Sequence, residues 1–291
     1  MKSCVFDIGS NTIRAVVFEI NGGKIDILFN KGMKSMLFDY TVGEELSRGG
    51  MAELSAVISR LRGLTAGYEC DYHAFATSAF RDLKNQREVI DYIKDKNGII
   101  IHALSGGEEA ECDYLGICHE VGAVRGIGVD LGGGSCQLLS FSEDKLTQAV
   151  SVPLGTSRLK RSFVSGSLPS EEEGQRIYAY AIGELEKLAF SKTEKGVFVL
   201  GGSARAALAV KRTLSADGGA ECISVEELSE FIELAKTAGA EKLFKSVVKE
   251  RYDTVVIGMI ILKAIADYAG AAYIRVLACT VRDGYVRRYI M

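Results

Sequence analysis

Residues 128–139 read GVDLGGGSCQLL: an apolar run ends on Asp130, three glycines follow, and an apolar run resumes. This order predicts a strand, a tight turn and a second strand, with the Asp130 carboxylate at the mouth of the turn. Glycines lack a Cβ, so the N–H groups of such a turn can approach a phosphate closely, and the carboxylate can hold a divalent cation beside it. A glycine-rich hairpin with a capping aspartate would explain one such stretch equally well.

The same pattern occurs near the N-terminus, where residues 5–18 align without a gap on residues 128–141. The offset is 123 residues (130 − 7), and it places Asp7 over Asp130 and Gly9 over Gly132. Two copies of one strand–turn–strand unit, each opening a half of the chain, predict two similar lobes that face each other across a cleft. Two phosphate-facing hairpins would then clamp a phosphorylated ligand and its metal ion.

The composition is that of a folded globular chain, with 47% hydrophobic and 25% charged residues and only 2 prolines among 291 residues. No apolar run reaches the roughly 18 residues of a membrane span, and no secretory leader opens the chain, so we expect a cytoplasmic protein. The 7 cysteines show no C-x-x-C spacing, which fits a reducing compartment and argues against a zinc site. A net charge of −3 argues against broad electrostatic binding to nucleic acid.

The expected elements follow the same order in both halves, with three strands first and then helices alternating with strands. Strands are expected over residues 5–18 (a hairpin), 24–29, 72–75 and 99–104, and then over 124–141 (a hairpin), 146–153, 197–200 and 274–278. Helices are expected after Gly50, after Gly201-Gly202, and over about 85–94, 108–121, 170–190, 226–236 and 254–268, with Ser170 and Glu173 as a capping box and Ser224 as a helix cap. This order predicts an α/β fold of duplicated mixed sheets flanked by helices, with lobes at residues 1–122 and 123–291.

Two stretches of the first half carry charged side chains suited to chemistry on phosphates. Residues 105–110 (SGGEEA) place Glu108 and Glu109 in the first turn of a helix, where one of them could polarise a water, or both could simply complement the helix dipole. Residues 76–81 (ATSAFR) end in Arg81, which is suited to bidentate phosphate contact but could equally be a solvated surface arginine. In the second half, Gly201-Gly202-Ser203 could turn N–H groups toward further phosphates or only connect a strand to a helix.

Six motifs follow one another along the chain and span most of it: residues 7–12 (DIGSNT), 76–85 (ATSAFRDLKN), 104–110 (LSGGEEA), 129–135 (VDLGGGS), 153–159 (PLGTSRL) and 200–204 (LGGSA). Together they resemble the successive motifs of the exopolyphosphatase/guanosine pentaphosphate phosphatase (Ppx/GppA) family, in its short form. Glu250-Arg251 and Arg282-Asp283-Gly284 resemble the family's closing segment. The resemblance implies the two-lobe ribonuclease H-like fold of actin, sugar kinases and acetate kinase, and metal-dependent hydrolysis of phosphoanhydride bonds.

The resemblance also implies roles for individual residues. Glu109 matches the family's catalytic base, Asp130 the magnesium-linked carboxylate of the second phosphate loop, and Asp7 its counterpart in the first. The expected metal is Mg²⁺, or Mn²⁺ in its place, with Asp7 and Asp130 as its ligands. The residues expected to bind the substrate phosphates are Ser10, Asn11, Arg14, Ser78, Arg81, Gly132, Gly133, Gly134, Ser135, Gly202, Ser203 and Arg282.

One departure from the family concerns the expected catalytic set of Glu109, Asp130 and Gln137. The family usually reads Gly-Gly-Gly-Ser-Thr-Glu, whereas this chain has Cys136 and Gln137 at the last two positions. Gln137 keeps the shape and an acceptor oxygen of the glutamate but loses its negative charge. A carboxylate close to a magnesium phosphate site can contribute several kcal/mol to metal binding or transition-state stabilisation.

Two functions therefore stay open. The first is a hydrolase that releases the terminal phosphate of inorganic polyphosphate or the 5′ γ-phosphate of guanosine pentaphosphate, by way of a water activated by Glu109 with magnesium. The second is a catalytically weakened sensor, marked by Gln137, that binds polyphosphate or a guanosine penta- or tetraphosphate. A kinase of the same superfamily is disfavoured by the 76–85 and 104–110 motifs. We expect no nucleic-acid or membrane partner, and a homodimer would be unsurprising.

Overall fold

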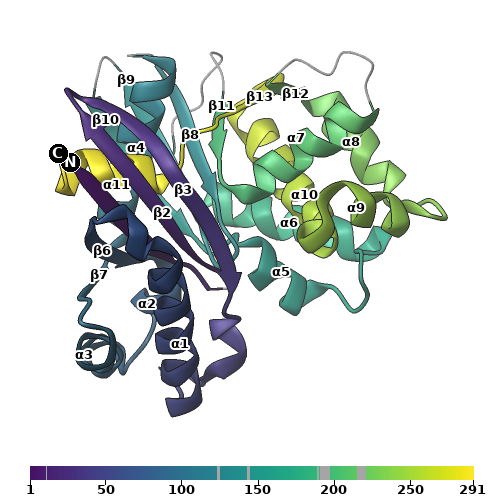
Figure 1. The fold of residues 1–291 in the computed structure, drawn as a ribbon. Coiled ribbons are helices and arrows are strands. Elements are labelled where there is room, and N and C mark those ends of the chain that lie inside the picture. The colour runs from purple at the N-terminus through teal and green to yellow at the C-terminus, as the bar shows by residue number, and fades with distance from the viewer. Residues whose placement is uncertain (11, 123–124, 143–144, 189, 191–196, 215–220) are drawn as a thin grey trace. The chain divides into compact units, whose positions relative to one another are not determined.

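The computed structural model describes residues 1–10, 12–122, 125–142, 145–188, 190, 197–214 and 221–291 (Figure 1). The chain divides into two compact units, Met1–Glu109 with Tyr285–Met291, and Ala110–Gly284. Helices α4 (Gly106–Val121) and α11 (Val281–Tyr289) each contain one junction between the units. The predicted lobes, 1–122 and 123–291, differ from these units at both junctions, because residues 110–122 group with the second unit and Tyr285–Met291 with the first.

The first unit is built on a five-stranded mixed sheet with the order β3-β2-β1-β6-β7. Its strands are β1 (Lys2–Ile8), β2 (Thr12–Asn21), β3 (Lys24–Lys34), β6 (Asp71–Ala76) and β7 (Ile101–Ala103). Strands β1 to β3 run antiparallel through short turns, whereas β6 and β7 run parallel to β1. Parallel pairs need long crossovers, and helices α1 (Arg48–Thr65) and α3 (Gln86–Asn97) supply them.

The core of the first unit lies between one face of this sheet and helix α1. Alternate residues of β1, namely Cys4, Phe6 and Ile8, are buried in one cluster with Leu54 and Ile58 of α1. The apolar positions of α1 repeat at helical spacing, as the sequence predicted. The shorter elements of this unit are η1 (Leu37–Tyr40), β4 (Thr41–Val42), β5 (Glu45–Leu46), η2 (Ala66–Tyr68) and α2 (Ser78–Arg81).

The second unit repeats the same topology with one strand added. Its sheet has the order β10-β9-β8-β11-β13-β12, with β8 (Gly126–Leu131), β9 (Cys136–Ser142), β10 (Lys145–Val152), β11 (Val197–Leu200), β12 (Cys222–Ser224) and β13 (Tyr273–Val276). Strands β8 to β10 are antiparallel, β11 and β13 extend the sheet in parallel, and β12 closes its edge antiparallel. The first residue of the predicted hairpin 124–141 lies outside the described residues.

The two hairpins also share their register. Asp7 pairs with Arg14 across β1 and β2, and Asp130 pairs with Gln137 across β8 and β9. Asp130 and Gln137 therefore follow Asp7 and Arg14 by the same 123 residues that the sequence alignment predicts. The predicted fold class, an α/β fold of two mixed sheets flanked by helices, is confirmed.

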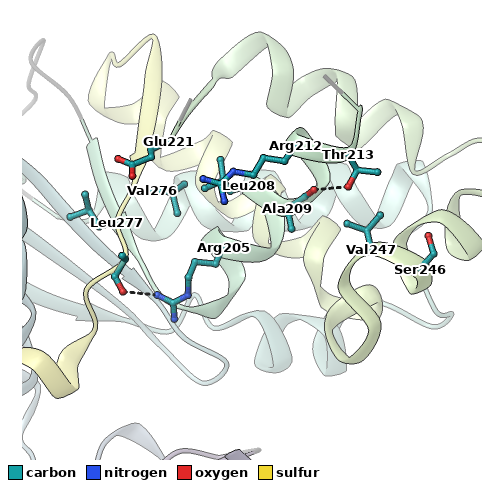
Figure 2. Close-up of a pocket in the computed structure, with 11 residues that line it drawn as sticks. Arg205, Leu208, Ala209, Arg212, Thr213, Glu221, Ser246, Val247, Val276 and Leu277 are labelled. Carbon is teal, nitrogen blue, oxygen red and sulfur yellow. Dashed lines mark hydrogen bonds between the residues drawn. The ribbon is translucent and has the colours of Figure 1, made fainter. Parts of the chain in front are cut away.

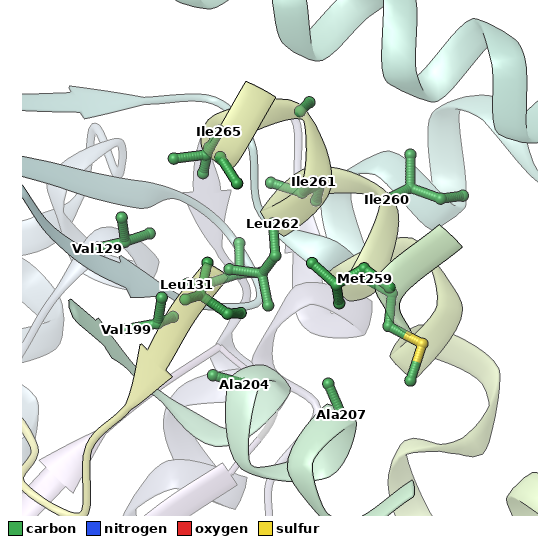
Figure 3. Packing of buried hydrophobic residues seen from close by; sticks show 14 of the residues in the cluster. Val129, Leu131, Val199, Ala204, Ala207, Met259, Ile260, Ile261, Leu262 and Ile265 are labelled. Carbon is green, nitrogen blue, oxygen red and sulfur yellow. The ribbon is translucent and has the colours of Figure 1, made fainter. Parts of the chain in front are cut away.

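Helix α10 (Tyr252–Ala269) is the centre of the larger core in the second unit. Figure 3 shows Ile261, Leu262 and Ile265 of this helix packed beside Val129 and Leu131 of β8. The other helices of the unit are α5 (Thr156–Phe163), α6 (Glu171–Glu186), α7 (Gly202–Leu214), α8 (Val225–Leu234), α9 (Ala240–Val248) and the short η3 (Lys249–Arg251). Within the described ranges, no helix has the length and apolarity that crossing a membrane requires.

Two helices of the second unit begin with a reciprocal pair of cap hydrogen bonds. The Ser170 hydroxyl accepts from the Glu173 N–H while the Glu173 carboxylate accepts from the Ser170 N–H, and Ser224 and Glu227 repeat the arrangement. The predicted capping residues Ser170 and Ser224 are confirmed. Helix α6 ends at Glu186, earlier than the predicted residue 190.

The second face of this sheet packs against helix α4. Ile117 of α4 shares a buried cluster with Leu139, Phe141 and Phe198 of the sheet. A close backbone approach lies at Gly284 in α11, where an added Cβ would lie 2.6 Å from the Cα of Cys112 in α4. No side chain fits between these two backbones.

We predict that Gly284→Ala destabilises the protein by about 1–3 kcal/mol, because the methyl group must push α4 and α11 apart. The free energy of unfolding is measured by urea denaturation. The matched control is Gly183→Ala, since Gly183 is in the interior of α6 with no atom within 4 Å of an added Cβ. The control should be neutral or slightly stabilising, because alanine is the better helix former. Equal effects of the two substitutions would contradict the packing explanation.

Candidate active site

The two glycine turns are closed by equivalent backbone hydrogen bonds. Gly9 N donates to Thr12 O at 3.1 Å in the first unit, and Gly132 N donates to Ser135 O at 3.0 Å in the second. An added Cβ on either glycine would lie 3.1 Å from that same carbonyl oxygen. Each turn follows a central strand of its sheet, so each places an aspartate at the carboxyl end of that strand, where ligands of α/β sheets usually bind.

In the second unit, backbone N–H groups at the start of helix α5 donate to the carbonyl groups of the glycine turn. Thr156 N donates to Gly132 O at 3.1 Å, and Ser157 N and Arg158 N donate to Gly133 O at 2.9 and 3.0 Å. In a trans peptide, the C=O of one residue and the N–H of the next point in opposite directions. The N–H groups of Gly133 and Gly134 are therefore directed away from α5, as a phosphate-binding loop requires.

Gly155, the residue before α5, makes this arrangement sterically feasible. An added Cβ on Gly155 would lie 2.5 Å from the carbonyl carbon of Gly133. Any residue with a side chain at this position would therefore push the turn away. The 153–159 motif thus has a structural explanation, because its glycine allows α5 to approach the Gly132–Ser135 turn.

A second turn, Gly201 and Gly202, lies beside Asp130. Gly201 has a positive φ of 95°, and an added Cβ there would lie 2.7 Å from the Asp130 Oδ1 atom. An added Cβ on Gly202 would lie 2.5 Å from the Cζ atom of Arg251. The Arg251 guanidinium therefore lies against the backbone of this turn, and Ser203 is buried next to it.

Arg251 is a candidate site residue that the sequence reasoning missed. It is exposed at the end of η3, beside a glycine turn that contacts Asp130. The sequence does indicate this region, because Glu250-Arg251 resembles the family's closing segment. The position of Arg251 in the sequence alone does not predict a role for its side chain.

Gln137 is buried, and it pairs with Asp130 on the neighbouring strand. Its side-chain amide nitrogen donates to Ser135 Oγ at 3.1 Å and to Ser151 Oγ at 3.2 Å. A glutamate at this position could only accept hydrogen bonds, so the Ser135 hydroxyl would have to turn its proton toward it. The Gln137 amide instead donates to Ser135 Oγ, so the proton of the Ser135 hydroxyl is not needed for this hydrogen bond.

In the first unit, Arg81 and Glu109 form an ion pair. Arg81 ends helix α2, which follows β6, and Glu109 is in the first turns of α4, which follows β7. Because β6 and β7 are adjacent and parallel, their carboxyl ends bring these two residues together. The Glu109 side chain is 6% exposed and the Arg81 side chain 19%.

The neighbouring Glu108 has a different environment. Its carboxylate accepts from Ser105 N at 2.9 Å and from Ser105 Oγ at 2.8 Å, and it also contacts His102 and Tyr289. The hydrogen bond from the Ser105 backbone is the main cause that lowers the pKa of Glu108 from 4.5 to about 2. Glu108 thus caps the helix, and Glu109 is the carboxylate presented to Arg81.

The other predicted phosphate-binding residues of the first unit, and Arg282 of the second, have different surroundings. Ser10 is buried at the first turn and Ser78 begins α2, whereas Asn11 lies outside the described residues. The Arg14 guanidinium donates to the Asn30 side chain of β3. Arg282 is in the first turn of α11, where the Asp283 carboxylate accepts from the N–H and hydroxyl of Thr280 as a helix cap.

For a metal ion, the second unit offers the carboxylate of Asp130 near the carboxyl end of β8. Across the described part of the chain, no group of three or more histidine, cysteine, aspartate and glutamate side chains could hold a metal. Mg²⁺ often binds through one or two carboxylates and completes its shell with waters and substrate phosphate oxygens. The oxygen donors at Asp130 fit an ion bound in this way.

The sequence profile of the Ppx/GppA phosphatase family matches residues 16–290. The chain belongs to this family. As a Ppx/GppA protein it is 25% identical to exopolyphosphatase 1 of Mycobacterium tuberculosis, over 99% of this chain and 88% of that protein. Exopolyphosphatase 1 of Mycobacterium leprae is 24% identical, with 99% and 89% covered.

Solved structures of Ppx/GppA proteins share the fold. The crystal structure of the Aquifex aeolicus family member superposes with a TM-score of 0.84 at 21% identity, covering 100% of this chain and 97% of that one. An exopolyphosphatase from Cytophaga hutchinsonii superposes with a TM-score of 0.83 at 17% identity, covering 99% and 97%. The predicted family is therefore confirmed, and so is the fold that the resemblance implied for it.

We predict that Glu108→Gln reduces the free energy of unfolding by about 1 kcal/mol at pH 7, a value discounted for partial exposure of the carboxylate. Because the folded pKa of about 2 lies below the ordinary 4.5, the charged carboxylate stabilises the fold above pH 4.5, and this contribution is lost as the pH falls toward 2. Urea denaturation between pH 7 and pH 2 should show the two proteins converging. A difference that stays constant over this range would contradict the assignment.

Proposed function

We propose that this chain hydrolyses the terminal phosphoanhydride bond of inorganic polyphosphate or of the 5′ triphosphate of guanosine pentaphosphate. The observation that carries the proposal is the buried Glu109 carboxylate, which is paired with Arg81 while its neighbour Glu108 is used as a helix cap. Membership of the Ppx/GppA family and the names of its mycobacterial relatives support the same reaction class.

Glu109 is proposed to accept a proton from the attacking water. The water oxygen forms a bond to the terminal phosphorus, the bond from phosphorus to the bridging oxygen breaks, and the electron pair leaves with the shortened phosphate chain. Arg81 holds the carboxylate in place, and the guanidinium has five N–H donors, so it can also donate to phosphate oxygens. Orientation of the water and neutralisation of the developing charge supply most of the rate in such reactions.

The second unit is proposed to hold the phosphates. The N–H groups of Gly133 and Gly134, directed away from α5, would donate to phosphate oxygens. The exposed Arg251 beside Gly202 would add a positive charge. Mg²⁺, held by Asp130 with Asp7 as a second candidate ligand, would neutralise phosphate oxygens when bound. Ser10, Arg14, Ser78, Ser203 and Arg282 stay predicted phosphate contacts.

We predict that Glu109→Gln lowers kcat by at least about 100-fold while the dissociation constant of the substrate changes by less than about threefold, because only the proton acceptor is lost. Phosphate release is measured in single-turnover and steady-state assays, and binding by calorimetry. Glu108→Gln is the matched control and should keep kcat within about threefold. Loss of binding with unchanged turnover per bound substrate would contradict the role of Glu109 as the base.

A binding protein with little hydrolytic activity is the second candidate, and the buried neutral Gln137 favours it. If this reading holds, the wild type binds polyphosphate or guanosine pentaphosphate without releasing phosphate. The loss of one carboxylate beside Asp130 would weaken magnesium binding, which would reduce the rate before it reduced affinity for the polyanion.

We predict that Gln137→Glu raises the magnesium affinity and the rate of phosphate release, by about tenfold or more, since it restores a charge next to Asp130. The assay is magnesium-dependent phosphate release from long-chain polyphosphate and from guanosine pentaphosphate. Activity of the wild type would establish the hydrolase. A silent wild type that becomes active on this substitution would establish the binding protein, and an unchanged rate and magnesium dependence would show that Gln137 is not near the metal.

A further inference from the structure

Arg81 is carried by helix α2, which has only 4 residues, Ser78–Arg81. Within the described part of the chain, the side chain of Thr77 gives this helix no capping hydrogen bond. Four residues make about one helical turn, and so short a helix has little stability of its own. The position of Arg81 against Glu109 therefore depends on what holds the chain around α2.

The second unit contains an arginine in an equivalent place. Arg81 Nη1 donates at 3.5 Å to the carbonyl oxygen of Leu104, just after β7. Arg205 Nη1 donates at 3.5 Å to the carbonyl oxygen of Ala278, just after β13 (Figure 2). Arg205, however, is part of the 13-residue helix α7, which packs into the core of its unit through Leu208. Arg205 is thus held by its own helix, whereas Arg81 needs another support.

Asn85, at the start of helix α3, provides this support by binding the backbone of Leu46 in β5. Leu46 N donates to Asn85 Oδ1 at 3.0 Å, and Asn85 Nδ2 donates to Leu46 O at 2.9 Å. An amide is both donor and acceptor, so it satisfies both backbone groups of one residue. Beside this pair, Lys84 N donates to Glu44 O at 2.8 Å. The Leu46 side chain is 2% exposed, so Asn85 is tied to the core of the first unit.

The connection from Asn85 back to Arg81 is short and hydrogen-bonded. Gln86 Nε2 and Leu83 N both donate to the carbonyl oxygen of Phe80, at 2.9 and 3.2 Å. This carbonyl belongs to the peptide group that joins Phe80 to Arg81. The backbone of Arg81 is therefore fixed by the residues on either side of Asn85.

We propose that Asn85 is a positioning residue, which ties residues 82–85 to Leu46 and thereby holds Arg81 against Glu109. The inference rests on the proposed function and deepens it, because it adds a residue that acts through Arg81 on the geometry of the proposed base. It also explains why the 76–85 motif extends beyond its arginine as far as Asn85.

The test compares Asn85→Ala with Asn97→Ala in the hydrolysis of inorganic tripolyphosphate. Asn97 is the last residue of α3, and its amide donates to Ser55 O and Ser59 Oγ of α1, at 3.1 and 2.9 Å. Both substitutions remove an amide that ties an end of α3 to the first unit, so both should lower the urea midpoint of unfolding. Only Asn85→Ala is expected to lower kcat, by about tenfold or more with KM changed less than about threefold, because a displaced Arg81 misplaces the base.

A double-mutant cycle separates an effect through Arg81 from a general loosening of the fold. In an Arg81→Ala background, Asn85→Ala should lower kcat by less than about twofold further, because the group that it positions is gone. Hydrogen exchange adds a measurement that needs no substrate. Peptides covering residues 78–84 should exchange about tenfold faster in Asn85→Ala and at the wild-type rate in Asn97→Ala.

The two proposals fail in different ways. Equal kcat values of Asn85→Ala and Asn97→Ala, or a loss that multiplies with that of Arg81→Ala, would overturn the role of Asn85 even if the wild type hydrolyses tripolyphosphate. A wild type that releases no phosphate would overturn the hydrolase, and hydrogen exchange then decides about Asn85. Faster exchange confined to residues 78–84 would support the positioning of Arg81, and wild-type exchange there would overturn it.

Discussion

A single backbone hydrogen bond, from the glycine N–H to the carbonyl oxygen three residues later, closes both glycine turns. It occurs at Gly9 and at Gly132 with nearly the same length, 3.1 and 3.0 Å. This hydrogen bond leaves Asp7 and Asp130 near the ends of the central strands β1 and β8. The peptide groups between the two bonded residues lie outside the sheet. In the second unit, these peptides are then oriented by α5, because binding their carbonyl groups from one side directs the next N–H groups to the other.

The duplicated scaffold has been elaborated differently in its two halves. The second unit surrounds its turn with close backbone approaches at Gly155 and Gly201, which suit it to holding a polyanion by N–H groups. The first unit places an arginine and a buried carboxylate at the ends of two parallel strands. A common fold thus carries two different sets of polar groups, backbone N–H groups in the second unit and an arginine–carboxylate pair in the first.

The sequence predicted what depends on local pattern. The 123-residue offset gave the register of both hairpins, and Ser170 and Ser224 gave two helix starts, because turns and caps are determined by neighbouring residues. The sequence did not predict helix α5, because it is only 8 residues long and its few apolar positions make a stripe too short to distinguish from a loop. The contact of Arg251 with Gly202 joins positions far apart in sequence, so only the packing of α10 and α7 brings them together.

The neutral side chain of Gln137 has two opposing consequences for a highly charged substrate. Losing a carboxylate beside Asp130 weakens the attraction for magnesium, but it also removes repulsion between the site and phosphate oxygens. The amide further fixes Ser135 as an acceptor, so the serine hydroxyl proton can point toward a ligand rather than toward residue 137. On the proposed function, binding of the polyanion would therefore depend less on the metal than it would with a glutamate, while the chemical step, in which charge shifts onto the leaving oxygen, would depend on the metal as before.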